Sequence, residues 1–225
     1  MRRINGRRIS TVSGWMTMCS LMVMASLVGC SGTPKAAHSG FLDDYSKLKP
    51  AEKWDGAYYW ESPTYKDYHR FKVDPIIVHF APNAEGTAID PGQLKQLTDR
   101  ATQKLMEVIA KREKLVDQPG PGVARLQAAI TSIKTTTAVA NIHPAMRMSG
   151  VGLGGAAFEA KAVDSVTGEL LVAVYDSRPG SRIGLTEGWR QLGHAEQVID
   201  RWIALFGNYL DQLVEQRQRA KKSGS

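Results

Sequence analysis

The stretch FEAKAVDSVTGELLVAVY, residues 158–175, predicts a β-hairpin and so indicates the fold class. Its first half alternates two sets of side chains, namely Phe158, Ala160, Ala162 and Asp164 against Glu159, Lys161 and Val163. Alternation is typical of a strand, because successive side chains point to opposite faces of a sheet. Residues 170–175 are again strand-like, and Gly168 in the short connection is free to take a positive φ. We therefore expect two strands joined by a tight turn.

Two segments upstream of the hairpin also have the content of strands. Residues 74–80, DPIIVHF, are β-branched and apolar, which is typical of a buried strand. Residues 126–137 are rich in Ile and Thr and alternate approximately, with one slip of phase before Ile133. Both segments are expected to join the same sheet as the hairpin.

Two other segments have helical spacing. Asp90 offers a capping oxygen and Pro91 suits a first helical turn, and a helix is predicted from there to near Lys114. Its apolar face consists of Leu94, Leu97, Ala101, Leu105, Val108 and Ile109. A longer helix is predicted from Thr186 and Glu187 onward, with an apolar stripe of Leu192, Ala195, Ile199, Trp202, Phe206, Tyr209 and Leu213. The order β-α-β-β-β-α predicts one α+β domain, with both amphipathic helices on one face of a mostly antiparallel sheet.

Residues 40–71 are rich in aromatic side chains and follow neither the strand period nor the helix period, so we expect a largely irregular segment laid over the domain. The rings considered as candidate binding residues are Trp54, Tyr58, Tyr59, Trp60, Tyr65 and Tyr68. Aromatic rings offer flat apolar area with a polar edge, which suits contact with a glycan or a partner protein. The same rings could instead cover the sheet of a small domain. Both interpretations stay open on the sequence.

The first 29 residues have the layout of a secretory signal: a basic start, an apolar run from Trp15 to Val28 and small residues at its end. The run is too short and too often interrupted by polar residues for a permanent membrane span. Its end, LVGC at residues 27–30, resembles the bacterial lipobox, in which the chain is cut after Gly29. By that resemblance, Cys30 carries a diacylglyceryl thioether and an N-acyl chain.

These features predict the organisation of the chain. Residues 1–29 are expected to be a cleaved signal peptide, 30–39 a lipidated tether, 40–215 a periplasmic α+β domain and 216–225 a basic flexible tail. By the enterobacterial sorting rule, an Asp after the lipidated cysteine favours the inner membrane. Ser31 occupies that position and so points to the outer membrane.

Charge and cysteine content exclude several classes of function. The full chain carries +7, from 29 basic and 22 acidic residues, and loss of the four arginines in the signal leaves +3. This charge is too small to indicate nucleic-acid binding. Cys19 leaves with the signal and Cys30 is modified, so the mature domain has no thiol for a disulfide, a metal or a nucleophile. The five histidines show no metal-ligand spacing, and no cofactor is expected.

Several short stretches together resemble one bacterial family. They are SGFLDDYSKL at 39–48, VDP at 73–75, GGA at 154–156 followed by Glu159, and DSVTGE at 164–169. In order and spacing they are similar to the lipoprotein family catalogued as domain of unknown function 3313 (DUF3313). The likeness runs from Ser39 to about Leu213. It implies a cell-envelope lipoprotein, and it carries no established activity or catalytic residues.

We therefore expect a non-enzymatic lipoprotein of the outer membrane, whose periplasmic domain binds or assists another envelope component. Its partners would be the membrane, through the N-terminal lipid, and an envelope protein or peptidoglycan. The alternative is an envelope hydrolase that acts on glycan or lipid with carboxylates of the hairpin, namely Glu159, Asp164, Glu169 and Asp176. The hydrolase requires these carboxylates to converge in a pocket.

Overall fold

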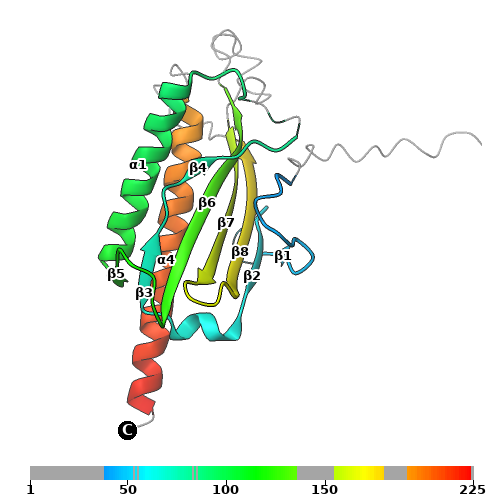
Figure 1. Ribbon diagram of the computed structural model, residues 1–225. Helices are drawn as coiled ribbons and strands as arrows, with labels where there is room; N and C mark the ends of the chain where they lie inside the picture. The colour runs from blue at the N-terminus through cyan, green and yellow to red at the C-terminus, as the bar shows by residue number, and fades with distance from the viewer. Residues whose placement is uncertain are drawn as a thin grey trace, which may run out of the picture. The chain divides into compact units, whose positions relative to one another are not determined.

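The computed structural model describes residues 38–52, 54, 56–82, 84, 86–135, 155–179 and 192–223 (Figure 1). These residues form an eight-stranded, mostly antiparallel sheet with the two long helices α1 and α4 on one face. The predicted α+β class is thus confirmed. The expected signal with Gly29 and Cys30, residues 136–154 and the expected start of the last helix at Thr186 lie outside the described residues.

The strands are β1 Lys49–Pro50, β2 Tyr58–Glu61, β3 Arg70–Val73, β4 Ile77–Val78, β5 Lys114–Leu115, β6 Val123–Lys134, β7 Gly155–Asp164 and β8 Leu170–Pro179. They lie side by side in the order β1-β2-β8-β7-β6-β3-β5, and β4 pairs with β6. The β3–β5, β3–β6 and β4–β6 pairs are parallel, and the other pairs are antiparallel. The helices are η1 Pro63–Asp67, α1 Pro91–Ala110 and α4 Gly193–Ser223.

The predicted hairpin is confirmed and is longer than its sequence pattern. Strands β7 and β8 pair from Gly155 opposite Pro179 to Val163 opposite Leu170, with one irregularity after Ala162. Gly168 takes a φ of 76° and donates its N–H to the carbonyl of Asp164 at 2.9 Å. Strand β6 completes an antiparallel meander with this hairpin, in the region where the Ile- and Thr-rich alternation predicts a strand.

Residues 40–71 contain more regular structure than the sequence indicates, because β1, β2 and η1 lie there and β3 begins there. Strand β2 pairs with β8, and its four residues are all half-buried, so burial does not separate the two faces of this strand. The strand predicted over residues 74–80 contains only Ile77–Val78. Pro75 has no N–H to donate, which interrupts the pairing with β6.

Both helices keep their predicted apolar faces but differ at their ends. Asp90 caps α1 by accepting the N–H of Gln93 at 3.0 Å, and α1 ends at Ala110 because the chain then turns into β5. Helix α4 continues through Ser223, so most of the segment expected to be a flexible tail is helical. Arg217 fastens it to the domain by donating to the carbonyls of Lys66 and Tyr68, each at 2.8 Å.

The core consists of two buried clusters between the sheet and the helices. The first cluster comprises Ile89, Leu97, Ala101, Ile130, Ile133, Ala156, Leu192, Ala195, Val198, Ile199, Trp202 and Ile203. The second comprises Tyr65, Phe71, Ile109, Ala124, Leu126, Ala162, Leu171, Leu210 and Leu213. Each helix contributes residues to both clusters. Ion pairs also join this region to α4: Lys104 of α1 pairs with Asp200 at 2.8 Å, and Arg112, just beyond the end of α1, pairs with Asp211 at 2.7 Å.

Gly86, just before α1, should tolerate no side chain. It has a φ of 97°, and a Cβ there would lie 2.7 Å from the carbonyl oxygen of Ile133 in β6. We expect Gly86→Ala to lower the free energy of unfolding by about 2 to 4 kcal/mol, through backbone strain and overlap with β6. Gly168→Ala is the matched control: its φ is also positive, but it has open space, so about 1 kcal/mol is expected.

Urea unfolding midpoints of the two variants at neutral pH measure this difference. Equal losses of stability in the two variants would show that contact with β6 is not the cause.

Candidate functional site

The strap, residues 38–45, lies across the face of the sheet that is turned away from the helices (Figure 1). Strand β7 determines this placement, because its neighbouring residues face opposite ways. Phe158 contacts the ring of Trp202 in α4, with centroids 4.2 Å apart, whereas Glu159 faces the strap. The alternation that predicted the strand therefore gives β7 a helix-facing side and a strap-facing side.

Glu159 is fully buried and holds the strap by three hydrogen bonds. It accepts the backbone N–H groups of Ser39 at 2.8 Å and Leu42 at 3.2 Å, and the hydroxyl of Tyr45 at 2.6 Å. A buried carboxylate is costly unless donors replace its water, and here two backbone groups and a phenol do so. Burial and this carboxylate together raise the pKa of Tyr45. The phenol therefore stays protonated as a donor.

Further contacts fix the strap beside Glu159. Lys161 donates to the carbonyl of Phe41 at 3.2 Å and to the carboxylate of Asp43 at 2.9 Å, which lowers the pKa of Asp43. The ring of His38 stacks on Tyr45, with centroids 4.0 Å apart. The chain is thus attached to the sheet from residue 38 onward.

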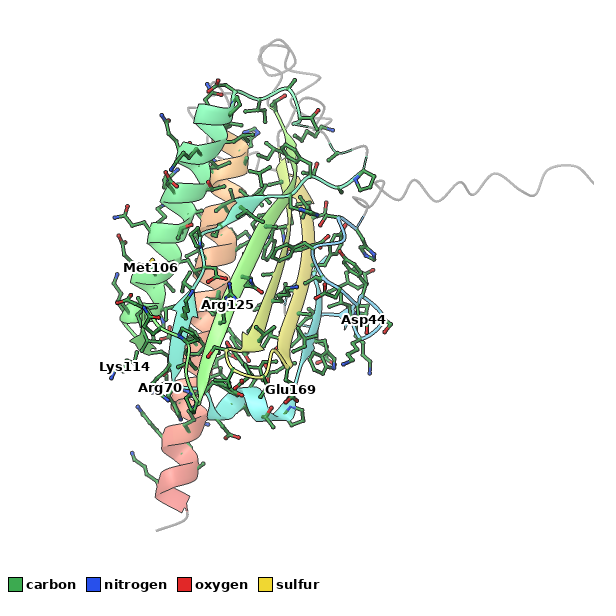
Figure 2. The ribbon with its side chains drawn as sticks, viewed as in Figure 1. Asp44, Arg70, Met106, Lys114, Arg125 and Glu169 are labelled. Carbon is green, nitrogen blue, oxygen red and sulfur yellow. The ribbon has the colours of Figure 1, made fainter. Side chains whose placement is uncertain are left out.

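Removal of the Glu159 carboxylate should release the strap. We expect Glu159→Ala to lower the free energy of unfolding by about 2 kcal/mol and to speed amide exchange of the strap at least tenfold, because its N–H groups lose their acceptor. Glu169→Ala is the matched control, since Glu169 lies exposed at the turn of the same hairpin (Figure 2). Hydrogen exchange read by mass spectrometry measures both, and unchanged strap exchange in Glu159→Ala would contradict the assignment.

The four hairpin carboxylates do not converge. Glu159 faces the strap, and Asp176 faces the opposite side of the sheet, where it accepts the indole N–H of Trp202 at 2.9 Å. Asp164 lies at the turn, and Glu169 is exposed beside it. These four residues therefore do not form the pocket that the hydrolase alternative requires.

Asp164 organises the turn of the hairpin. Its carboxylate accepts the N–H groups of Val166 at 2.9 Å and Thr167 at 2.8 Å, and the hydroxyl of Tyr68 at 2.7 Å. The Thr167 N–H, followed by the Tyr68 hydroxyl, lowers the pKa of Asp164 to about 2. Burial and the hydrogen bond to Asp164 raise the pKa of Tyr68 to about 12. Tyr68, one of the predicted binding residues, therefore uses its hydroxyl to hold the hairpin turn.

The pKa of Asp164 predicts a dependence of stability on pH. Because it is lowered from an ordinary 3.8 to about 2, its stabilisation is present above pH 4 and is lost as pH falls toward 2. We expect Asp164→Asn to cost about 1 to 2 kcal/mol at pH 7 and progressively less below pH 4. Urea midpoints against pH measure this, with the exposed Glu169→Gln as control. A deficit that stays constant down to pH 2 would refute the assignment.

The six candidate rings do not form one exposed patch. Tyr58 and Trp60 lie on the strap-facing side of β2, where Tyr58 packs edge-on to Tyr175 and Lys47 lies 4.8 Å from the ring of Trp60. The other face of β2 carries Tyr59, whose hydroxyl approaches that of Tyr209 at 3.4 Å. Strand alternation thus places neighbouring rings on opposite sides of the sheet.

Trp54, Tyr59 and Tyr65 gather around Tyr209 of α4. Trp54 lies edge-on to Tyr59 and to Tyr209, with centroids 5.7 and 6.2 Å apart. Tyr65 is 1% exposed and stacks on Tyr209 at 6.2 Å. The sequence analysis missed Tyr209 and Glu61 as members of this cluster. Tyr209 belongs to an apolar stripe typical of core, and nothing local relates it to residues so far upstream.

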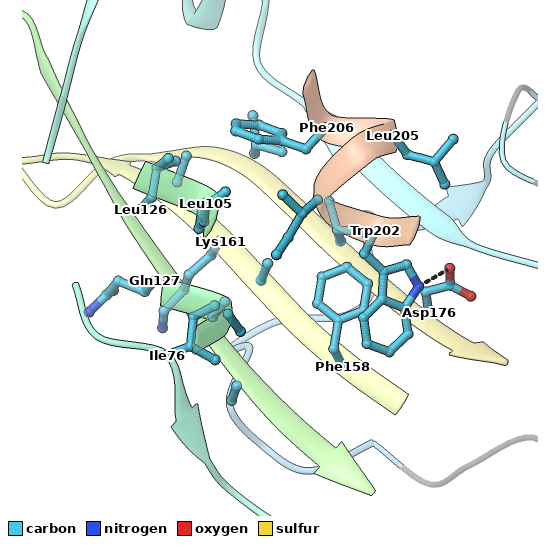
Figure 3. A pocket seen from close by; sticks show the side chains of 18 of the residues that line it. Ile76, Leu105, Leu126, Gln127, Phe158, Lys161, Asp176, Trp202, Leu205 and Phe206 are labelled. Atoms are coloured by element: carbon cyan, nitrogen blue, oxygen red, sulfur yellow. Dashed lines mark hydrogen bonds between the residues drawn. The ribbon is translucent and has the colours of Figure 1, made fainter. Parts of the chain in front are cut away.

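An apolar cavity of about 130 Å³ lies between the two core clusters (Figure 3). Its lining includes Ala128 and Ala160 from the sheet, Leu105 from α1 and Phe206 from α4. Two groups of side chains in mutual contact also line it: Phe158, Trp202 and Asp176 form one, and Trp54, Tyr59 and Tyr209 form the other.

Each of these two groups includes or adjoins a carboxylate that accepts a hydrogen bond from a ring in α4. Asp176 accepts from Trp202 and also pairs with Arg178, and burial raises the pKa of Asp176. Glu61 accepts the hydroxyls of both Tyr59 and Tyr209. Burial is the main cause of the raised pKa of both tyrosines, which keeps them protonated as donors.

Within the part of the chain that the structure describes, no three His, Cys, Asp or Glu side chains gather in an arrangement that could bind a metal. The described helices include none whose length and apolarity would allow it to cross a membrane.

The chain matches the model of the family described as "Protein of unknown function (DUF3313)" over residues 37–206. It belongs to this family, as the resemblance of its sequence predicted. No curated protein matches it.

Solved structures show distant similarity. The PelC dodecamer from Paraburkholderia phytofirmans is 12% identical, with a TM-score of 0.36, over 64% of this chain and 95% of that one. Protein XCC0632 from Xanthomonas campestris is 14% identical, with a TM-score of 0.39, over 71% and 94%. A putative neuraminyllactose-binding hemagglutinin homologue from Helicobacter pylori is 8% identical, with a TM-score of 0.37, over 71% and 91%.

Proposed function

We propose that this protein is a lipoprotein of the bacterial outer membrane, held by acyl chains on Cys30, whose periplasmic domain is a non-enzymatic binding or accessory component of the envelope. The single observation that carries the proposal is the strap. Eight residues, 31–38, separate Cys30 from Ser39, whose N–H group Glu159 accepts. These eight residues are therefore all that connects the proposed anchor to the part of the domain held by Glu159.

The short connection limits how far the domain can lie from the membrane. An extended chain spans at most about 3.3 to 3.6 Å per residue, so the strap lies within about 30 Å of a lipidated Cys30. Several acyl chains on one residue suffice for stable anchoring, since each buried methylene contributes about 0.8 kcal/mol. The domain then acts on components at or near the membrane surface.

The proposed partners follow from this position. They are the membrane itself, through the lipid, and an envelope protein or peptidoglycan close to it. The small net charge of the mature chain does not suit nucleic acid. The separated carboxylates of the hairpin support a binding role over hydrolysis.

Labelling of growing cells with an alkyne analogue of palmitate tests the anchor. We expect the wild type and Cys19→Ala to be labelled equally, and Cys30→Ala to lose at least 90% of the label, because only Cys30 provides the modified thiol. In a density gradient, the labelled wild-type protein should sediment with the outer membrane.

Cys19→Ala is the matched control, because it removes the only other cysteine and leaves the proposed cleavage site intact. Undiminished labelling of Cys30→Ala, or an amino terminus in the purified protein that retains the first arginines, would overturn the proposal.

A further inference from the structure

The floor of the apolar cavity is a patch of the sheet with Ala160 of β7 near its middle. Along β7, the lining side chains run from Phe158 to Ala162, four residues or about 14 Å. Across the sheet, they run from Ala128 of β6 to Tyr59 of β2, which is three strand spacings or again about 14 Å. The floor is therefore about as long along the strands as across them.

The middle of the floor carries small side chains, and larger ones surround them. Ala128 and Ala160 are only partly buried, although α1 and α4 cover this face of the sheet (Figure 1). Their larger neighbours Leu126, Ile130 and Val174 are buried. The two alanines are thus more accessible than the side chains beside them, as expected at the bottom of a hollow that a small molecule can enter.

Helix α4 closes the cavity from the opposite side, with α1 beside it. Trp202 and Phe206 of α4 and Leu105 of α1 line this side (Figure 3). The hydrogen bond from Trp202 to Asp176 fixes α4 on the sheet. Protein interiors are ordinarily packed as densely as organic crystals, so an unfilled space of about 130 Å³ lacks contacts that a ligand would supply.

We propose that this cavity binds one compact apolar molecule, about the size of a six-membered carbon ring. An apolar cavity of comparable size, about 150 Å³, accepts benzene in another protein. The similar extent of the floor in both directions suits a compact molecule. This site goes beyond the proposed function, since it concerns residues of the folded domain and does not depend on the anchor.

The polar side chains that line or adjoin the cavity already have partners. Trp202 donates to Asp176, and Tyr209 donates to Glu61. Lys161 is the one Lys or Arg among the described lining residues, and it donates to a carbonyl and a carboxylate of the strap. A charged group is costly to bury in an apolar space without a partner of its own. The composition of the lining therefore favours an apolar ligand.

Photolabelling tests the site on the full chain, purified in digitonin because this detergent has no alkyl tail to compete. The probe is phenyl(trifluoromethyl)diazirine, a single ring with a photoreactive group. We expect its label on peptides of β7 and α4, and at least fivefold less label with excess benzene. Benzoate and tetramethylammonium, which are charged, and squalane, a much larger hydrocarbon, should displace the probe far less.

Ala160→Leu should fill the middle of the floor and lower the labelling at least fivefold, because the larger side chain occupies the space of the ligand. Val166→Leu is the matched control, since Val166 is 63% exposed at the hairpin turn, and its labelling should equal that of the wild type. If Ala160→Leu does not fold, Ala128→Leu fills the same hollow and decides the question.

Unchanged labelling in a folded floor variant, or label confined to exposed segments, would overturn the site. Displacement by squalane as strong as by benzene would overturn the compact ligand. Displacement by benzoate or tetramethylammonium as strong as by benzene would overturn the apolar one.

Discussion

The two-sided burial of strand β7 is the constraint on which the rest of the structure depends. One side packs Phe158, Ala160 and Ala162 under the helices, and the other buries the carboxylate of Glu159. A charge in this position is tolerable only with a full set of donors, and the strap supplies them through its backbone and Tyr45. The sheet therefore cannot be complete on this face without the residues that precede it in the chain, and the path of the N-terminal segment follows from the chemistry of one strand.

The helix-facing side of β7 has the opposite character, since its side chains are apolar and two of them, Ala160 and Ala162, are small. Ala128 and Ala160 leave space above the sheet, and the two core clusters lie on either side of it. A sheet and two helices would ordinarily close such a gap by moving together. Here the hydrogen bonds of Trp202 to Asp176 and of Tyr209 to Glu61 fix α4 on the sheet, and ion pairs such as that between Lys104 and Asp200 join α4 to α1.

In the proposed lipoprotein, the two faces of the sheet have different contacts. The strap face connects the domain to the proposed lipid on Cys30 and limits its distance from the membrane. The helix face contains the cavity. The end of α4 is also attached, since Arg217 donates to the carbonyls of Lys66 and Tyr68.

Local pattern by itself determined the hairpin, the capped start of α1, the apolar faces of both helices and the α+β class, because each depends on the spacing of residues close in the chain. Only the tertiary structure decided that β2 pairs with β8, that neighbouring rings of β2 lie on opposite faces, and that Glu61 meets Tyr209, 148 residues away. It also decided that Glu159 and Asp176 point apart. The physical reason is that the spacing of residues along the chain shows which face of a strand or helix a side chain occupies. Which residue lies opposite that face depends on how segments distant in the sequence pack around the core.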